Sequence, residues 1–337
     1  MSKTKRFLLI FLQYAIFLGL GIILLYFAFR SIDFQVLVDN LKHTRYDLVV
    51  LSLFFGFGGM LARAYRWQLM IEPLGYKPRF ANTYHALIIG YTANYAFPRI
   101  GEVTRCGVLG RTEKRPADAL LGTVIAERIF DVLVLFLLTI LVILLKIKEF
   151  GGFFSQKVFI PLGKKFGWLF DFSIYTWILA GLAVAAGFFL VYAFRNQIRK
   201  ITLVGKIKKI AKGVFIGFKS ILYLKRKQAF FASTLAIWVF FLLMTYICLK
   251  AMQPTAHLTM VDALFLLVVG SYGFAAPVQA GIGAYHGMIA LALSIYAISW
   301  SDGLAYALLS HGAQAVSIIF MGLISMLLLF LKKRQTR

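Results

Sequence analysis

The sequence has little of what a soluble enzyme of its length needs. Only 15% of its 337 residues are charged, whereas soluble domains carry about 25%. It contains no HExxH motif, no cysteine and histidine cluster with metal-ligand spacing, and no GxxxxGKS/T phosphate loop. We therefore expect no metal site, no cofactor and no nucleotide hydrolysis by this chain.

Cysteine and acidic residues are scarce as well. The two cysteines, Cys106 and Cys248, predict no disulfide framework. Thirteen acidic residues stand against 37 basic ones, which gives a formal charge of +24. The longest polar segment, residues 195–227, has about 33 residues, too few for a catalytic domain. We therefore do not expect an enzyme.

Apolar residues fill the rest of the chain. They make up 61% of the sequence, and the mean hydropathy is +0.81, which indicates a polytopic membrane protein. The first apolar run is too long for the apolar part of a signal peptide and predicts a first span. Full spans are expected at residues 7–29, from 48–61 onward, and at 119–145, 174–194, 230–249 and 304–331.

Two further apolar segments are interrupted. Residues 83–97 cover roughly 22 Å as a helix, short of a ~30 Å hydrocarbon core, and end at Pro98 and Gly101. A second break lies between Pro277 and Gly283. Broken backbone at membrane depth must be satisfied inside protein or beside a water-filled cavity, and paired breaks mark transport sites.

These patterns predict an all-α integral membrane protein with a polytopic helical bundle. Six full spans and two interrupted, re-entrant hairpins are expected, one hairpin opening to each side, as in an inverted repeat. Residues 1–337 form one domain. It divides into an N-terminal half at 1–194, a cytoplasmic linker at 195–228 and a C-terminal half at 229–337.

Basic residues predict the orientation. Eleven lie between 195 and 227 with no acidic residue among them, and others precede the first span and follow the last. Lys and Arg mark cytoplasmic loops, so both termini should be cytoplasmic in a multi-pass protein of the cell inner membrane. The linker has helical apolar periodicity and should lie on anionic inner-leaflet lipids. Its thin aromatic content argues against nucleic acid.

Charged residues within the apolar segments suggest a site. Glu127 and Asp131 lie roughly 12 and 18 Å into their span and share a helical face with Arg128 nearby. Each such charge costs about 2.5–3.5 kcal/mol to insert, so these residues should face the bundle interior. A purely structural ion pair is the alternative to a binding role.

Arginines near the first break are the second part of this site. Arg99, Arg105 and free N–H groups at the helix start near Gly101 could bind a lipid phosphate, while Glu102 could simply oppose the helix dipole. Arg63 and Arg66, beside Trp67, fit either an interfacial anchor or the entrance to a phosphate cavity. The candidate substrate-binding residues are Arg63, Arg66, Asn94, Arg99, Glu102, Arg105, Glu127, Arg128, Asp131, Gln279 and His286.

The motif combination resembles a known family. Asn94…Pro98-Arg99-x-Gly101-Glu102-x-x-Arg105, Glu127-Arg128-x-x-Asp131, Pro277…Gly281-x-Gly283 and the upstream Arg63 and Arg66-Trp67 are similar to the flippase-like transmembrane domain of lysylphosphatidylglycerol synthases. In that family the membrane domain moves an aminoacylated phospholipid, and a separate soluble domain makes the ester. This chain resembles the stand-alone members without that domain.

The chain departs from the family pattern at two positions. His286 stands where a glutamate is usual, and Ala280 stands where a glycine is usual. The missing carboxylate argues against a cationic aminoacyl headgroup as cargo. His286 could titrate near neutral pH, which would permit proton coupling.

Three functions follow from the residues and the resemblance. The expected one is a flippase or translocase that moves a phosphate-bearing membrane lipid between leaflets. The second is a non-catalytic lipid-binding scaffold for a separate synthase, transferase or glycosyltransferase. The third is an intramembrane transferase with Glu127 or His286 as base, although no catalytic residue is expected.

Overall fold

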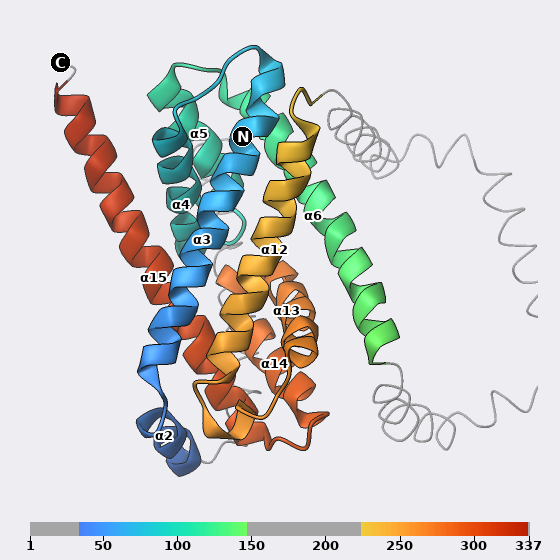
Figure 1. Cartoon of the computed structure of the whole chain (residues 1–337). Helices are drawn as coiled ribbons and strands as arrows, with labels where there is room; N and C mark the ends of the chain where they lie inside the picture. Colours follow the sequence, from blue (N-terminus) through green and yellow to red (C-terminus); the bar gives the residue numbers. More distant parts are fainter. Residues whose placement is uncertain (1–33, 147–223, 336–337) are drawn as a thin grey trace, which may run out of the picture.

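The computed structural model describes residues 34–146 and 224–335, and all regular secondary structure in these two stretches is helical (Figure 1). The predicted all-α membrane fold is confirmed. Four helices are long and apolar enough to cross a membrane, namely α3 (Tyr46–Ile71), α6 (Ala117–Leu145), α12 (Lys227–Leu249) and α15 (Trp300–Gln335). The predicted spans at 7–29 and 174–194 and nearly all of the 195–228 linker lie outside the described residues.

Helix α3 is longer than its apolar run. Residues 48–61 were the predicted core of the span, but the helix continues past Arg63 and Arg66 to Ile71. Both arginines have carboxylate partners inside the bundle, so the helix can continue past them into the interior. The short helices around the spans are α2 (Phe34–Lys42), η1 (Glu72–Leu74) and η3 (Gln253–Thr255).

The first break forms a re-entrant hairpin of α4 (Phe80–Ala96) and α5 (Gly101–Glu113). Pro98 disfavours helical backbone in the residue before it, and Phe97 is extended at φ −139° and ψ 131°. Gly101 then lets the two arms approach, because a Cβ there would collide with the carbonyl oxygen of Gly90. The predicted half-helix and its return are confirmed.

The second break forms a hairpin of α13 (Met260–Ala275) and α14 (Ala284–Ser294), with η4 (Gln279–Gly281) between them. Thr259 starts α13 with a capping box, in which its hydroxyl and the Asp262 carboxylate satisfy each other's backbone N–H groups. Helix α14 ends at Ser294, and a turn separates it from α15. This hairpin lies in the half of the bundle opposite the first (Figure 1).

The order of elements repeats with inverted direction. A full span, a hairpin and a full span follow one another as α3, α4–α5, α6 and again as α12, α13–α14, α15. Helices α3 and α12 pack side by side and run in opposite directions (Figure 1). The described residues therefore have the element order of an inverted repeat.

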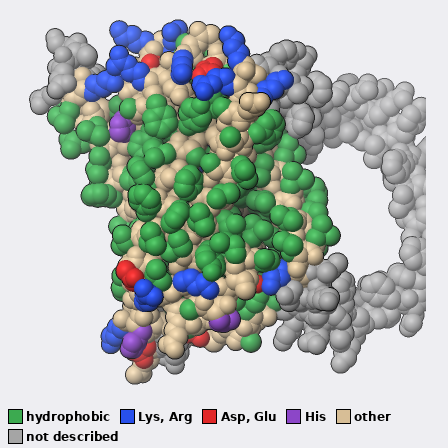
Figure 2. Space-filling view, in the orientation of Figure 1, with side chains coloured by type: hydrophobic (Ala, Val, Ile, Leu, Met, Phe, Trp, Pro, Cys, Tyr) green, Lys and Arg blue, Asp and Glu red, His purple; other side chains and the backbone are tan. Residues whose placement is uncertain are grey.

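The tips of the two hairpins meet in the middle of the bundle. Helix α4 contacts η4, and Arg99 donates a hydrogen bond from Nη2 to the carbonyl of Ala275, the last residue of α13, over 2.9 Å. Figure 2 shows an apolar band at this level, with Lys and Arg gathered at both ends of the molecule. Both breaks thus lie at the depth where unsatisfied backbone is most costly.

Candidate functional site

Seven charged side chains gather between α3, α5 and α6. We call this set the charged cluster. It comprises Arg63 and Arg66 from α3, Glu102 and Arg105 from α5, and Glu127, Arg128 and Asp131 from α6. All seven were predicted from the sequence as site residues, and the structure brings them together. Four guanidinium groups and three carboxylates give the cluster a formal charge of +1.

Glu127 lies at the centre of the cluster and is fully buried. Its Oε2 accepts a hydrogen bond from Arg105 Nη2 over 2.8 Å, and its Oε1 accepts one from Arg66 Nη2 over 3.2 Å. Arg63 Nη1 lies 3.7 Å from the same Oε1. A buried carboxylate is tolerated only with such partners, so three arginines hold this one.

Asp131 is the second carboxylate of α6 that faces the bundle interior. It accepts from Arg66 Nη2 over 2.5 Å and from Arg63 Nη1 over 3.1 Å. Arg63 also donates to the Tyr91 hydroxyl of α4 over 2.8 Å. Arg63 and Arg66 are three residues apart and the two acids four apart, so each pair presents one helical face to the other.

Arg128 is the accessible member of the cluster. Its side chain is 38% exposed, and its Nε lies 3.4 Å from Glu102 Oε1. From the sequence, Glu127 and Asp131 could either pair with Arg128 of their own helix or bind a positive headgroup. Arg128 lies 3.8 Å from Asp131, but no ion pair joins it to Glu127 within the described residues. The reason is that Arg63, Arg66 and Arg105 already surround that carboxylate.

Trp67 is not an interfacial anchor, and that interpretation of its neighbours is wrong. The indole is fully buried, its Nε1 donates to Thr123 Oγ1 over 2.9 Å, and the Arg105 guanidinium lies 4.7 Å from its ring centroid. Arg66 is fully buried as well, so it does not form a cavity entrance. Trp67 therefore stabilises the Arg105 guanidinium of the cluster by a cation–π contact.

A small pocket opens beside the cluster between α4, α5 and α6. Asn94, Glu102, Arg105 and Arg128 line it, together with apolar and glycine residues of α4 and with Tyr91. Its free space is about that of one water molecule. Arg105 Nη1 and Glu102 Oε2 are buried there without a hydrogen-bond partner among the described residues. The pocket thus offers an unused guanidinium N–H to an anion.

Comparison with known proteins identifies the family. The family described as the lysylphosphatidylglycerol synthase TM region matches residues 10–322. The chain belongs to this family. It is also similar to a UPF0104 membrane protein of Methanocaldococcus jannaschii, with 22% identity over 318 residues, covering 88% of this chain and 89% of that protein. No solved structure matches the chain.

The remaining predicted site residues lie around the two breaks. Asn94 lines the pocket, and its Oδ1 accepts a hydrogen bond from the Gly101 N–H over 2.7 Å. We expected this N–H to be free to bind phosphate, and that expectation is wrong. Arg99 lies at the meeting point of the hairpin tips, outside the charged cluster.

Gln279 and His286 belong to the second break. Gln279 is buried in η4, and the His286 Nδ1 accepts the Gly283 N–H over 3.2 Å at the start of α14. The His286 ring centroid lies 5.0 Å from that of His311 on α15. The structure therefore places these two residues in the other half of the family fold, away from the charged cluster.

Sequence reasoning missed the supporting residues. Tyr91, Thr123 and the buried role of Trp67 were not predicted, although each contacts an arginine of the cluster or a residue that packs on one. A signal for Trp67 existed: it directly follows Arg66, whose partners had to lie in the interior. The two hydroxyl residues carried no comparable signal.

Proposed function

We propose that this chain moves a phosphate-bearing membrane lipid between leaflets. The observation that carries the proposal is the pocket beside the charged cluster, where Arg105 Nη1 is buried with no hydrogen-bond partner among the described residues and Arg128 is partly exposed. A phosphate could take the place of the Glu102 carboxylate on Arg128 and accept from Arg105. The cluster's formal charge of +1 would then be balanced by one phosphodiester charge.

The inverted repeat supports movement between two openings. The hairpins enter from opposite ends and meet through Arg99 and the Ala275 carbonyl. At the end where α6 finishes, Lys146 Nζ lies 2.7 Å from Asp262 Oδ1 and joins the two halves again. Rocking of one half against the other about these contacts would expose the pocket to one leaflet and then to the other.

The exposed charges support an orientation. At the end of the bundle where α12 begins and α5 ends, exposed basic residues dominate, namely Arg79, Arg111, Lys114, Arg115, Lys225, Arg226 and Lys227. By the positive-inside rule this end would face the cytoplasm of the cell, with both termini. The 195–228 linker would then lie on anionic inner-leaflet lipids.

Leaflet exchange in liposomes tests the proposal. The purified full chain is reconstituted with fluorescent phospholipids of several headgroups, and a membrane-impermeant quencher reports how fast the inner-leaflet label becomes accessible. We expect the wild type to exceed empty liposomes for anionic lipids. Arg105→Gln should abolish the gain, while Arg111→Gln, an exposed arginine outside the pocket, should leave it intact. Wild-type rates equal to those of empty liposomes for every headgroup would reject the carrier.

A non-catalytic scaffold for a separate synthase or glycosyltransferase is the second candidate. The pocket's small volume favours it, because a headgroup enters only if the helices separate. An intramembrane transferase is less favoured, since Glu127 is fully buried and all its ion partners are arginines. A scaffold would co-purify with its synthase from native membranes and show no leaflet exchange of its own.

A further inference from the structure

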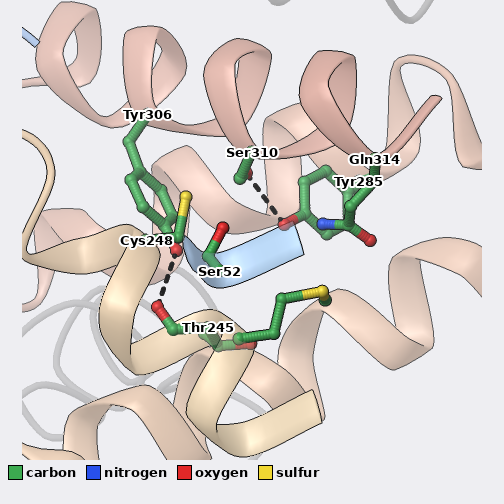
Figure 3. Close-up of a pocket in the computed structure, with 8 residues that line it drawn as sticks. Ser52, Thr245, Cys248, Tyr285, Tyr306, Ser310 and Gln314 are labelled. Atoms are coloured by element: carbon green, nitrogen blue, oxygen red, sulfur yellow. Dashed lines mark hydrogen bonds between the residues drawn. The ribbon is translucent and has the colours of Figure 1, made fainter. Parts of the chain in front are cut away.

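A second polar pocket lies in the C-terminal half of the bundle (Figure 3). We call it the hydroxyl pocket. Side chains of α3, α12, α14 and α15 line it, and none of them is charged: Ser52, Met244, Thr245, Cys248, Tyr285, Tyr306, Ser310 and Gln314. Most of these side chains are buried, so the pocket is an interior polar site.

The hydroxyl pocket occupies the position in its half that the charged cluster occupies in the other. Glu127 and Asp131 are the eleventh and fifteenth residues of α6, and Ser310 and Gln314 are the eleventh and fifteenth residues of α15. The inverted repeat therefore pairs each carboxylate with an uncharged polar residue.

The break residues correspond by their distance from a glycine of each break, although Arg105 is the fifth residue of α5 and Tyr285 the second residue of α14. Arg105 lies four residues after Gly101, and Tyr285 lies four residues after Gly281. Arg105 Nη2 bonds Glu127 over 2.8 Å, and the Tyr285 hydroxyl lies 3.1 Å from Ser310 Oγ (Figure 3). The same contact between hairpin and span is thus ionic in one half and neutral in the other.

The hydroxyl pocket has hydrogen-bonding capacity to spare. Gln314 makes no side-chain hydrogen bond within the described residues, and its amide borders the Tyr285 ring (Figure 3). Ser310 Oγ donates to the Ala307 carbonyl over 3.3 Å and so accepts from the Tyr285 hydroxyl over 3.1 Å, which leaves an acceptor lone pair on both oxygens. The free lone pairs can accept from a ligand and the Gln314 amide can both donate and accept, so an alcohol, which does both, can be bound by this lining.

The described interior offers no carboxylate to a free amine. Glu102, Glu127 and Asp131 are each within ion-pair distance of arginine, and Asp262 lies 2.7 Å from Lys146 Nζ. A cationic amine brought into this region would lose its hydration without a counter-charge, which is costly at low dielectric. An uncharged headgroup meets no such cost.

We propose that the hydroxyl pocket is a second headgroup subsite, and that the cargo is a phospholipid with one negative charge and an uncharged, hydroxyl-bearing headgroup. This rests on the proposed function. The charged cluster would take the phosphate, and the hydroxyl pocket, whose free space is about that of one water molecule, would take one alcohol group of a glycerol, polyol or sugar headgroup. An aminoacylated lipid, such as the lysyl ester in the family's name, would bind worse than its parent alcohol.

Lipid competition on the purified full chain tests the subsite without requiring transport. Native mass spectrometry compares equal mixtures of phosphatidylglycerol and phosphatidylethanol with identical acyl chains, which carry the same charge and differ in hydroxyl groups. We expect the wild type to retain about 3- to 10-fold more of the glycerol lipid, the effect of one or two net hydrogen bonds. Lysylphosphatidylglycerol should be retained less than phosphatidylglycerol.

Two pocket variants and one control test whether the hydroxyl pocket causes the preference for phosphatidylglycerol. Gln314→Leu and Ser310→Ala should bring the ratio close to one while total anionic lipid binding persists. Ser271→Ala, which removes a hydroxyl of α13 outside the pocket, should leave the ratio unchanged. Equal retention of both lipids by the wild type, or a preference that survives both pocket variants, would overturn the subsite. If the wild type shows the binding preference but no leaflet exchange, the carrier proposal is rejected and the subsite is not.

Discussion

The two halves of the bundle share a backbone plan and bury different chemistry. The N-terminal half surrounds Glu127 with guanidinium groups, whereas the C-terminal half places the Tyr285 and Ser310 hydroxyls at the corresponding contact. Both arrangements satisfy polar groups inside a low-dielectric region, so the plan itself does not require charge. The charges of the first half therefore need a reason beyond the fold, and anion binding supplies one.

The two halves should also differ in how much stability they lose when one polar partner is removed. An ionic cluster is sensitive to the loss of a member, because the charges that it leaves behind stay buried with fewer partners. A neutral hydrogen bond costs far less when one partner is removed. Matched substitutions at corresponding positions can measure this difference.

The largest effect should follow Glu127→Gln. Arg66 and Arg105, both buried, would lose the carboxylate between them, at a cost of about 3–5 kcal/mol. We expect a large drop in the melting temperature of the detergent-purified chain, or no monodisperse protein. The measurement is thermal unfolding followed by size-exclusion chromatography.

Ser310→Ala is the matched control, since Ser310 occupies the corresponding position of α15. It should cost only about 1 kcal/mol, the loss of one neutral hydrogen bond. If both variants were destabilised equally, the distinction between an ionic and a neutral half would be wrong.

The next effect is a partial rescue within the charged half. Arg105→Gln combined with Glu127→Gln removes one charge of each sign, so the double variant should be more stable than the sum of its parts. We expect a coupling of about 1–3 kcal/mol from the double-mutant cycle. Additive losses would show that Arg105 and Glu127 do not act as a pair, despite their 2.8 Å contact.

The sequence predicted much of this architecture because its signals were local. Pro98 and Pro277 break apolar runs, so the positions of both hairpins follow from the sequence alone. Membership of the charged cluster was also predictable, since charges in a span must face the interior.

The partners within the cluster could not be predicted. Which arginine reaches Glu127 depends on how α3, α5 and α6 approach each other, and neither spacing nor composition encodes that distance. The hydroxyl pocket was missed for a related reason. Ser310 and Tyr285 are ordinary residues for an apolar helix, and only the inverted repeat shows that they correspond to Glu127 and Arg105.

Substitutions in the two hairpins should have similar effects on stability, unlike substitutions in the charged cluster and the hydroxyl pocket. A Cβ on Gly101 would collide with the Gly90 carbonyl, and one on Gly273 would come 2.7 Å from the Tyr285 Cα. Gly101→Ala and Gly273→Ala should each cost about 1–3 kcal/mol through overpacking. Thermal unfolding of the two variants measures the similarity.

Gly107→Ala and Gly287→Ala serve as controls in the second arms of the same hairpins. Nothing lies within 4 Å of a Cβ at either position. Both should stabilise their helices by about 0.5–1 kcal/mol, since alanine is the better helix former. Loss of stability in the controls would mean that a methyl group destabilises these hairpins even where it has room, so the close approach of the arms would not explain the losses at Gly101 and Gly273.

The smallest effect concerns the backbone of the two breaks. Arg99 at φ 58° and Ala280 at φ 46° both hold a left-handed conformation that L side chains rarely adopt. Ala280→Gly removes a strain of about 1–2 kcal/mol and returns about 0.5–1 kcal/mol to the unfolded chain as entropy. We expect a net stabilisation of about 0.5–1 kcal/mol, seen as a small rise in melting temperature. Arg99→Gly relieves similar strain but also removes the hydrogen bond to Ala275 that joins the hairpin tips. It should therefore gain less than Ala280→Gly, and a larger gain would show that this bond contributes nothing to holding the halves together.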